Sequence, residues 1–338
     1  MKRHLMVAAG LMMFASVAGA QNECPAGQST ITGPDQKRAS QDACQMAVDV
    51  FGFVAPQLGL ALAGGNPTIG LGSTLGGLGH FSVGVRGNVF SGDLPQITQF
   101  TPGSNGRGNP AVLPSKSQVI GLPTVDAAIG LFSGIPLGLT NVGGVDLLVS
   151  ATYLPTIGDQ TSDVQIKPDQ SFKFGFGARL GILQESIVVP GVSLTYLKRD
   201  LPTTSILGKS SSIDVAITNA SVKTNAWRLM ASKSFLIFGL VAGVGQDKYD
   251  QSANVQATFR GTVLGGPPEA KSDVISLAQS ITRTNVFLDA SLNLPLFKLV
   301  GEVGQASGGS VSGLYDSFSG GTASKSRTYG SFGIRFGI

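Results

Sequence analysis

The chain ends in Ser331-Phe-Gly-Ile-Arg-Phe-Gly-Ile338, where apolar residues alternate with small or polar ones. Because successive side chains of a β-strand point to opposite faces, Phe332, Ile334, Phe336 and Ile338 share one face. A strand with an apolar outer face and a polar inner face is typical of a transmembrane β-barrel, where lipid lies outside and the lumen inside. The last strand therefore predicts an all-β fold of this kind.

The same segment resembles the C-terminal signal of bacterial outer-membrane barrels. In that family the final strand reads polar-x-Gly-x-x-apolar-x-apolar. Ser331, Gly333, Phe336 and Ile338 match these positions in order, although the family ends more often in an aromatic residue. The resemblance implies two partners, the barrel-assembly machinery acting through this strand and the lipid of the outer membrane.

The N-terminus predicts export. Lys2 and Arg3 precede an apolar run from Leu5 to Val17, and small residues follow at positions 18–20. This order is typical of a cleavable signal peptide, here residues 1–20. The alternative is a membrane anchor, but the apolar run is too short to span a bilayer and no stop-transfer pattern follows it.

The composition excludes several classes of protein. The 24 basic residues include Lys2 and Arg3, so the mature chain is nearly neutral against 20 acids, and no nucleic-acid partner is expected. Only 13% of residues are charged and 47 are glycine. The longest apolar run of the mature chain, 235–244, is too short for a transmembrane helix. A closed barrel satisfies every backbone polar group in lipid without such helices.

The two cysteines predict one disulfide. Cys24 and Cys44 enter an oxidising compartment after export, and a bridge between them closes a loop of about 20 residues. Such a bridge contributes on the order of 3 kcal/mol. Residues 21–23, Gln-Asn-Glu, are unsuited to a lipoprotein signal. With two thiols and one mature histidine, His80, we expect neither a metal site nor a cofactor.

The region before residue 80 predicts a periplasmic lead that covers residues 21–79. Its first part, 21–36, is polar and rich in turn residues. Apolar residues at helical spacing predict a short amphipathic helix over 37–50, which ends before Gly52 and Pro56. Residues 57–79 are rich in glycine and predict either a plug inside the lumen or a periplasmic cover.

From residue 80 to the end, apolar and polar residues alternate with a period of two, which predicts a barrel over 80–338. The clearest stretch is 172–182, and its length suits a tilted strand of about 10 residues. About ten strands are expected. They lie near 80–90, 121–132, 143–154, 171–182, 188–199, 212–234, 235–250, 273–294, 297–306 and 326–338.

The connections between these strands alternate in length, with short links such as 294–298 and long polar ones such as 91–120. This is typical of an up-and-down barrel with short periplasmic turns and long outer loops. A soluble β-sandwich also alternates, but its strands are shorter and its loops do not sort by length. Spans such as 212–234 exceed one crossing, so either they project from the membrane or further strands raise the count to between 12 and 14.

The predicted inner face carries charges of both signs. A structural set of ion pairs is favoured over a ligand path, because a lone charge is costly to bury in a narrow barrel. The predicted lumen-facing charged residues are Arg86, Asp126, Asp146, Lys173, Arg179, Arg228, Asp289, Glu302 and Arg335.

The size of the barrel decides what its lumen can do. Eight to ten strands leave an interior that side chains nearly fill, whereas an open aqueous channel needs about 16. With about 14 strands, residues 57–79 would serve as a plug. That layout is similar to the FadL family of hydrophobic-compound transporters, in which an N-terminal hatch blocks the lumen.

Three functions follow as hypotheses. The first is a non-enzymatic outer-membrane barrel that passes or binds small compounds, with apolar ones favoured. The second is a structural or adhesive barrel that acts through its outer loops. The third is a lipid-modifying enzyme, because His80 and Ser82 resemble the His-x-Ser pair of lipid A deacylases. No nearby glutamate completes that pattern, so no catalytic residue is assigned.

Overall fold

The computed structural model describes residues 24, 34–103, 110–261, 269–309, 311 and 313–337. The predicted signal peptide, residues 1–20, and the final residue of the C-terminal signal, Ile338, lie outside this range.

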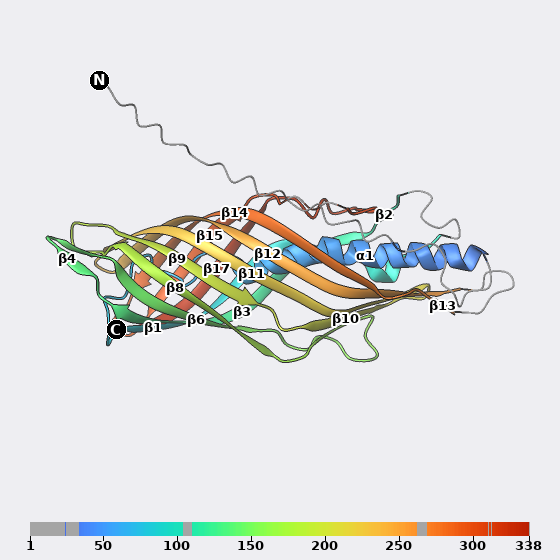
Figure 1. The fold of residues 1–338 in the computed structure, drawn as a ribbon, viewed down its shortest axis with the longest axis horizontal. Coiled ribbons are helices and arrows are strands. Elements are labelled where there is room, and N and C mark those ends of the chain that lie inside the picture. The colour runs from blue at the N-terminus through green and yellow to red at the C-terminus, as the bar shows by residue number, and fades with distance from the viewer. Residues whose placement is uncertain are drawn as a thin grey trace, which may run out of the picture.

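Ten strands of the described chain form a closed antiparallel ring in which each strand pairs with its neighbours in sequence. Pairing of the last strand with the first, and of β11 with β12, closes the ring. The ring confirms the predicted up-and-down barrel (Figure 1). Its strands are β1 (Phe81–Pro95), β3 (Ser115–Phe132), β6 (Gly144–Tyr153), β8 (Phe172–Leu183), β9 (Gly191–Asp200), β11 (Ile213–Phe235), β12 (Phe238–Arg260), β14 (Ile275–Asn293), β15 (Lys298–Ala306) and β17 (Arg327–Gly337).

The remaining short elements extend the two ends of the barrel. Figure 1 shows the β4–β5 hairpin and the C-terminus at one end, which we call the short-turn end. The other end, which we call the long-strand end, carries the extensions of β11 and β12, so the long spans are single projecting strands. The short elements are β2 (Val112–Leu113), β4 (Ile135–Leu137), β5 (Thr140–Val142), β7 (Val164–Pro168), β10 (Thr204–Lys209), β13 (Glu269–Lys271), β16 (Ser317–Phe318) and the 3-10 turn η1 (Ile97–Gln99).

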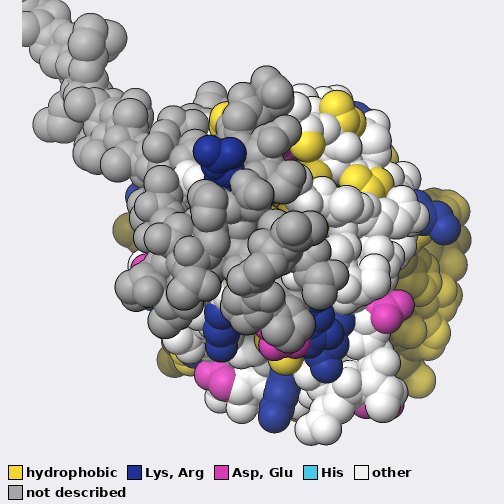
Figure 2. Space-filling view, turned by 90° about the vertical axis from the view of Figure 1, so that its right-hand side faces the viewer, with side chains coloured by type: hydrophobic (Ala, Val, Ile, Leu, Met, Phe, Trp, Pro, Cys, Tyr) yellow, Lys and Arg dark blue, Asp and Glu magenta, His cyan; other side chains and the backbone are white. Residues whose placement is uncertain are grey.

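The outer wall of the barrel is apolar. Phe174 and Phe176 are each 61% exposed, although large apolar side chains are normally buried in a soluble protein. Viewed from the long-strand end, charged side chains are spread over the facing surface and hydrophobic ones gather on the flank behind it (Figure 2). A belt of this kind fits lipid, so the fold is a transmembrane β-barrel.

The helix before the barrel is longer than predicted. It spans α1 (Pro34–Ala63) and continues through Gly52 and Pro56, where the sequence predicted an end. Among the described residues one helix, Arg38–Ala63, is long and apolar enough to cross a membrane, but 89% of its most apolar window is buried inside the protein. Pro56 has no N–H to donate to the carbonyl of Gly52 one turn earlier, and the neighbouring Gln57 donates its side-chain amide to the carbonyl of Phe53 at 3.1 Å.

The first half of α1 packs within the long-strand end. It forms a hydrophobic core with the projecting parts of β11 and β12, and Phe53 stacks on Phe318 at 4.0 Å between ring centroids. The predicted disulfide between Cys24 and Cys44 is confirmed and is buried in the same core.

The chain runs through the barrel from one end to the other. Asp42 of α1 bonds to the β1–β3 connection at the long-strand end, through the N–H of Gly103 at 2.8 Å. Thr74, by contrast, bonds to Gln184 in the short β8–β9 turn. We expected residues 21–79 to form a periplasmic lead on the side of the short turns, but α1 enters from the opposite end (Figure 1).

This direction predicts on which side of the membrane the helix begins. We expect an epitope inserted ahead of Pro34 to be accessible from the same side as one inserted between β12 and β14. An epitope in the 294–297 turn should be accessible only from the other side. Antibody labelling of intact and permeabilised cells measures this, and joint labelling of the first and third epitopes would contradict the observed path.

A second prediction concerns the contact of α1 with the β15–β17 connection. The carboxylate of Asp49 accepts hydrogen bonds from the backbone N–H groups of Tyr315 at 3.1 Å and Asp316 at 2.9 Å. Burial raises the pKa of Asp49 to about 7, these backbone bonds oppose the rise, and the charge of Asp316 adds to it. Because the folded pKa exceeds the unfolded value, the contact is most stable below about pH 4 and weakens as the pH rises towards 7.

Hydrogen exchange at Tyr315 and Asp316, corrected for the intrinsic rate, should therefore accelerate between pH 4 and pH 7.5 in the wild type. An Asp49→Asn variant has no such carboxyl, and its corrected exchange should stay nearly constant. Parallel pH profiles in the two proteins would show that Asp49 does not control this contact.

Candidate functional site

Residues 64–79, which follow α1, cross the lumen without regular secondary structure, and we call them the plug. Glycines allow close contact on both sides. A Cβ on Gly181 of β8 would lie 2.8 Å from the hydroxyl of Thr74, and one on Gly70 would lie 2.7 Å from the side chain of Val300. A barrel of ten strands can therefore hold an internal segment that we expected only for about 14.

Three arginines of the wall donate to backbone carbonyls in and just before the plug. Arg86 reaches the carbonyl of Asn66 at 2.7 Å, and Arg199 reaches that of Pro67 at 3.1 Å. Arg228 reaches the carbonyls of Ala63 and Gly65, both at 3.1 Å. Because an irregular segment satisfies few of its own carbonyls, these side chains replace the missing backbone bonds.

Each of these arginines also pairs with an aspartate of the wall. Asp126 lies 2.8 Å from both Arg86 and Arg199, and Asp247 lies 2.6 Å from Arg228. Nearer the short-turn end, Arg179 lies 3.6 Å from Asp146. The ion pairs limit the cost of burying the guanidinium groups and orient their remaining N–H groups towards the plug.

The opposite wall holds the plug through acceptors. Asp289 of β14 and Glu302 of β15 are directly opposite in register. Asn66 donates its backbone N–H to Glu302 and its side-chain amide to Asp289, both at 2.7 Å. Asp289 also accepts from the N–H of Gly70 at 2.9 Å. The plug is thus bound by donors on one side and by acceptors on the other.

Contacts of a similar kind extend along the plug to the short-turn end. Arg179 reaches the carbonyl of Ser73 at 3.1 Å, and Ser193 reaches that of Gly72 at 2.7 Å. The N–H of Leu75 donates to Asp146 at 3.1 Å. The hydrogen bonds that hold the plug are therefore distributed along its length.

The structure places the predicted lumen-facing residues as follows. Arg86, Asp126, Asp146, Arg179, Arg228, Asp289, Glu302 and Arg335 are buried, and Lys173 is half-buried. Arg199 and Asp247 were not predicted from the sequence, and they complete the pairs of the plug site. Arg199 lies on the same face of β9 as the buried Thr195, and Asp247 lies on the same face of β12 as the buried Gly245. The alternation of the sequence could therefore have predicted both as lumen-facing.

The His80 and Ser82 pair does not form the predicted arrangement. The first strand begins at Phe81, so His80 precedes it and is exposed, whereas Ser82 is buried on the inner face. We expected both side chains on one face of a strand. Among the described residues no hydrogen bond joins them.

No family model matches the chain, and no curated protein matches it. Among solved structures, the chain is similar to the transport unit of the autotransporter AIDA-I from Escherichia coli, with a TM-score of 0.31, 8% identity, and coverage of 89% of this chain and 99% of that chain. The toluene transporter TodX from Pseudomonas putida matches with a TM-score of 0.34, 8% identity, and coverage of 82% and 98%. The toluene transporter TbuX from Ralstonia pickettii matches with a TM-score of 0.28 and 12% identity. The match covers 82% of this chain and 98% of that chain. At these identities and TM-scores, neither the role of any residue nor a substrate is assigned to this chain from the similarity.

One glycine offers a test of how the plug is held. Gly65 has a φ of +74°, and an added Cβ would overlap the carboxylate of Glu302. A left-handed conformation costs a non-glycine residue about 1–2 kcal/mol before any overlap. We expect Gly65→Ala to speed hydrogen exchange of the plug amides by at least about tenfold.

Gly301→Ala is the matched control. Gly301 directly precedes Glu302 in β15 but lies on the outer face of the barrel, and a Cβ added there meets nothing within 4 Å. Its plug amides should exchange as in the wild type. Equal exchange in both variants would show that close contact at Gly65 does not hold the plug.

Proposed function

We propose that this protein is an outer-membrane β-barrel that binds small compounds and passes them through its lumen when the plug is displaced. The observation that carries the proposal is a continuous barrel whose lumen is filled by an irregular segment held mainly by hydrogen bonds. An apolar core inside the barrel would give a purely structural protein more stability, because buried polar contacts add little net stability.

The orientation follows from the same proposal. Barrels of the outer membrane have short turns on the periplasmic side and longer connections outside. The short-turn end then faces the periplasm, and the long-strand end with the first half of α1 faces outward. The predicted signal peptide and the C-terminal signal support this location.

The strength of the contacts suggests which part of the plug moves. Residues 72–75 make five hydrogen bonds, two with Gln184 and one each with Ser193, Arg179 and Asp146. At about 1 kcal/mol net for each bond, their release costs on the order of 5 kcal/mol, so about 1 molecule in 10³ to 10⁴ is open without ligand. Release of the whole plug would break the arginine contacts of residues 63–67 as well. Local displacement at the short-turn end is therefore favoured.

The projecting long-strand end supports a second candidate function, a structural or adhesive one. There α1 and the extensions of β11 and β12 form a packed unit beyond the apolar belt. Such a unit presents a rigid polar surface. Variants that alter this surface without changing solute flux, but that abolish attachment of cells to a surface, would favour this function.

A disulfide lock tests the transport proposal. Thr74 of the plug and Gly181 of β8 are close, since a Cβ on Gly181 would lie 3.5 Å from the Cβ of Thr74. This separation suits a disulfide. We expect the oxidised Thr74→Cys/Gly181→Cys protein in liposomes to show at least about tenfold less solute flux than its reduced form.

The two single variants and the wild type, each with and without reductant, control for effects on the native disulfide. None of these should change with the redox state. Flux that is equal in the oxidised and reduced double variant would contradict a mobile plug, and an absence of flux in every sample would contradict transport.

A further inference from the structure

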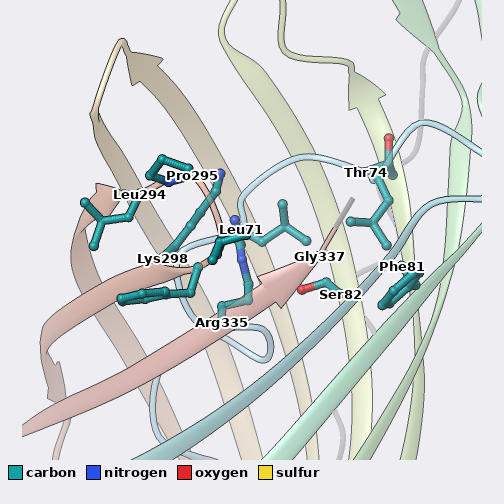
Figure 3. A pocket seen from close by; sticks show the side chains of 12 residues that line it. Leu71, Thr74, Phe81, Ser82, Leu294, Pro295, Lys298, Arg335 and Gly337 are labelled. Carbon is teal, nitrogen blue, oxygen red and sulfur yellow. The ribbon is translucent and has the colours of Figure 1, made fainter.

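The short-turn end of the lumen contains a cavity of about 270 Å³ between the plug and the wall. It lies beside the β14–β15 turn and the start of β1 (Figure 3). The charged residues that line it are Lys298 of β15 and Arg335 of β17. A second cavity of about 380 Å³, on the other side of Leu71, shares both cations.

The strand register places these two cations directly opposite each other. Lys298 pairs with Arg335 across β15 and β17, and both line the lumen. Like charges in opposite positions of a sheet destabilise it, and burial increases that cost. In Figure 3 both side chains extend towards Leu71, so the two cationic groups face the same space.

Neither cation has a carboxylate within 4 Å among the described residues, although Glu185 attracts both from a longer distance and Asp289 attracts Arg335. Arg335 is 6% exposed, and its guanidinium makes one long hydrogen bond, to the carbonyl of Ile69 at 3.4 Å. No described hydrogen bond or ion pair satisfies the ammonium group of Lys298. Glu185 lies in the second cavity, but its oxygens accept from Ser232 at 2.7 Å and from the N–H of Ser234 at 2.6 Å.

This arrangement differs from that of the other buried arginines of the lumen wall. Arg283 also has no carboxylate within 4 Å in the described part of the chain, but it donates to the backbone carbonyls of Ser307, Ala323 and Lys325 at 2.7, 2.8 and 3.0 Å. Arg86, Arg179, Arg199 and Arg228 each lie within 4 Å of an aspartate. Arg335 is buried to a similar degree without that compensation. Because a buried charge without a close partner is costly, an anion bound between the two cations would stabilise this part of the lumen.

The remaining wall of the first cavity defines the rest of the ligand. Leu71, Leu75, Phe297 and Leu294 supply apolar surface, and the hydroxyl of Ser82 supplies a further donor. A guanidinium binds a carboxylate through two parallel hydrogen bonds, and the ammonium adds a third contact. The volume suits a compact body with few atoms rather than a long chain.

We propose that Lys298 and Arg335 form a binding site for a small organic anion with one carboxylate and a compact apolar body. Its carboxylate lies between the two cations and its body lies against Leu71 and Leu75. Because the plug supplies Leu71 and Leu75, a bound anion also contacts the part of the plug that is proposed to move. The inference rests on the proposed function for its role in transport, but the site itself does not depend on flux.

Equilibrium binding of benzoate to the purified full-length protein in detergent tests the site. We expect benzoate to bind and to raise the midpoint of thermal unfolding of the wild type. Arg335→Gln and Lys298→Gln should each weaken binding by about tenfold or more, which corresponds to about 1.4 kcal/mol. Lys173→Gln is the matched control, because Lys173 belongs to the inner face of β8 but does not line either cavity.

The two variants also have a readout without ligand. Because each removes one of two opposed cations, the unliganded variants should unfold at the same temperature as the wild type or above it. A lower midpoint would show that the cations are already compensated within the chain, which would overturn the proposal. Because two positions are tested, a folding defect in one variant still allows the other variant to test the site.

Two further probes separate the parts of the ligand. Benzyl alcohol, which lacks the charge, should bind equally weakly to the wild type and both variants. Inorganic phosphate should bind more weakly than benzoate, and equal affinity would overturn the apolar part of the proposal. Unchanged benzoate binding in both Gln variants would overturn the site, whereas a failed disulfide lock with normal benzoate binding would contradict transport alone.

Discussion

The hydrogen bonds from wall arginines to plug carbonyls are the interaction on which the lumen depends. Beyond Ala63 the chain has no regular structure inside a closed barrel, so its carbonyls cannot be satisfied by a helix or a sheet. Arg86, Arg199 and Arg228 supply the missing donors. Without them, several buried carbonyls would be unsatisfied at a cost of about 1–3 kcal/mol each.

The ion pairs of the wall follow from the same requirement. An arginine carries five donors in a planar group, more than one aspartate can accept, so pairing with Asp126 or Asp247 leaves donors free for the plug. A lysine has a compact head and could not bridge two acceptors in the same geometry. Structural pairs across the barrel were predicted from the sequence, and the structure adds the plug backbone as a common acceptor for the arginines.

The strands were predictable because lipid and lumen impose a strict period of two on every crossing. Phe174 and Phe176 are exposed and Asp146 and Arg179 are buried, as the alternation indicated. The full length of α1 was not predictable, because Gly52 and Pro56 are normally signs of a helix end. Enclosure by β11 and β12 overrides that local signal, since the helix satisfies most of its backbone bonds while the barrel covers its apolar surface on every side.

Around Asn66 the contacts of the plug are polarised across the barrel, and this is visible only in the register of the strands. Its carbonyls face the arginines of β1, β9 and β11, whereas the N–H groups of Asn66 and Gly70 face Asp289 and Glu302 on β14 and β15. The same register that sets two acids opposite each other there sets two cations, Lys298 and Arg335, opposite each other one strand further along. The plug compensates the acids with its amides but has no anion for the cations. The wall of β14, β15 and β17 is therefore the side of the lumen where the chain's own interactions are incomplete.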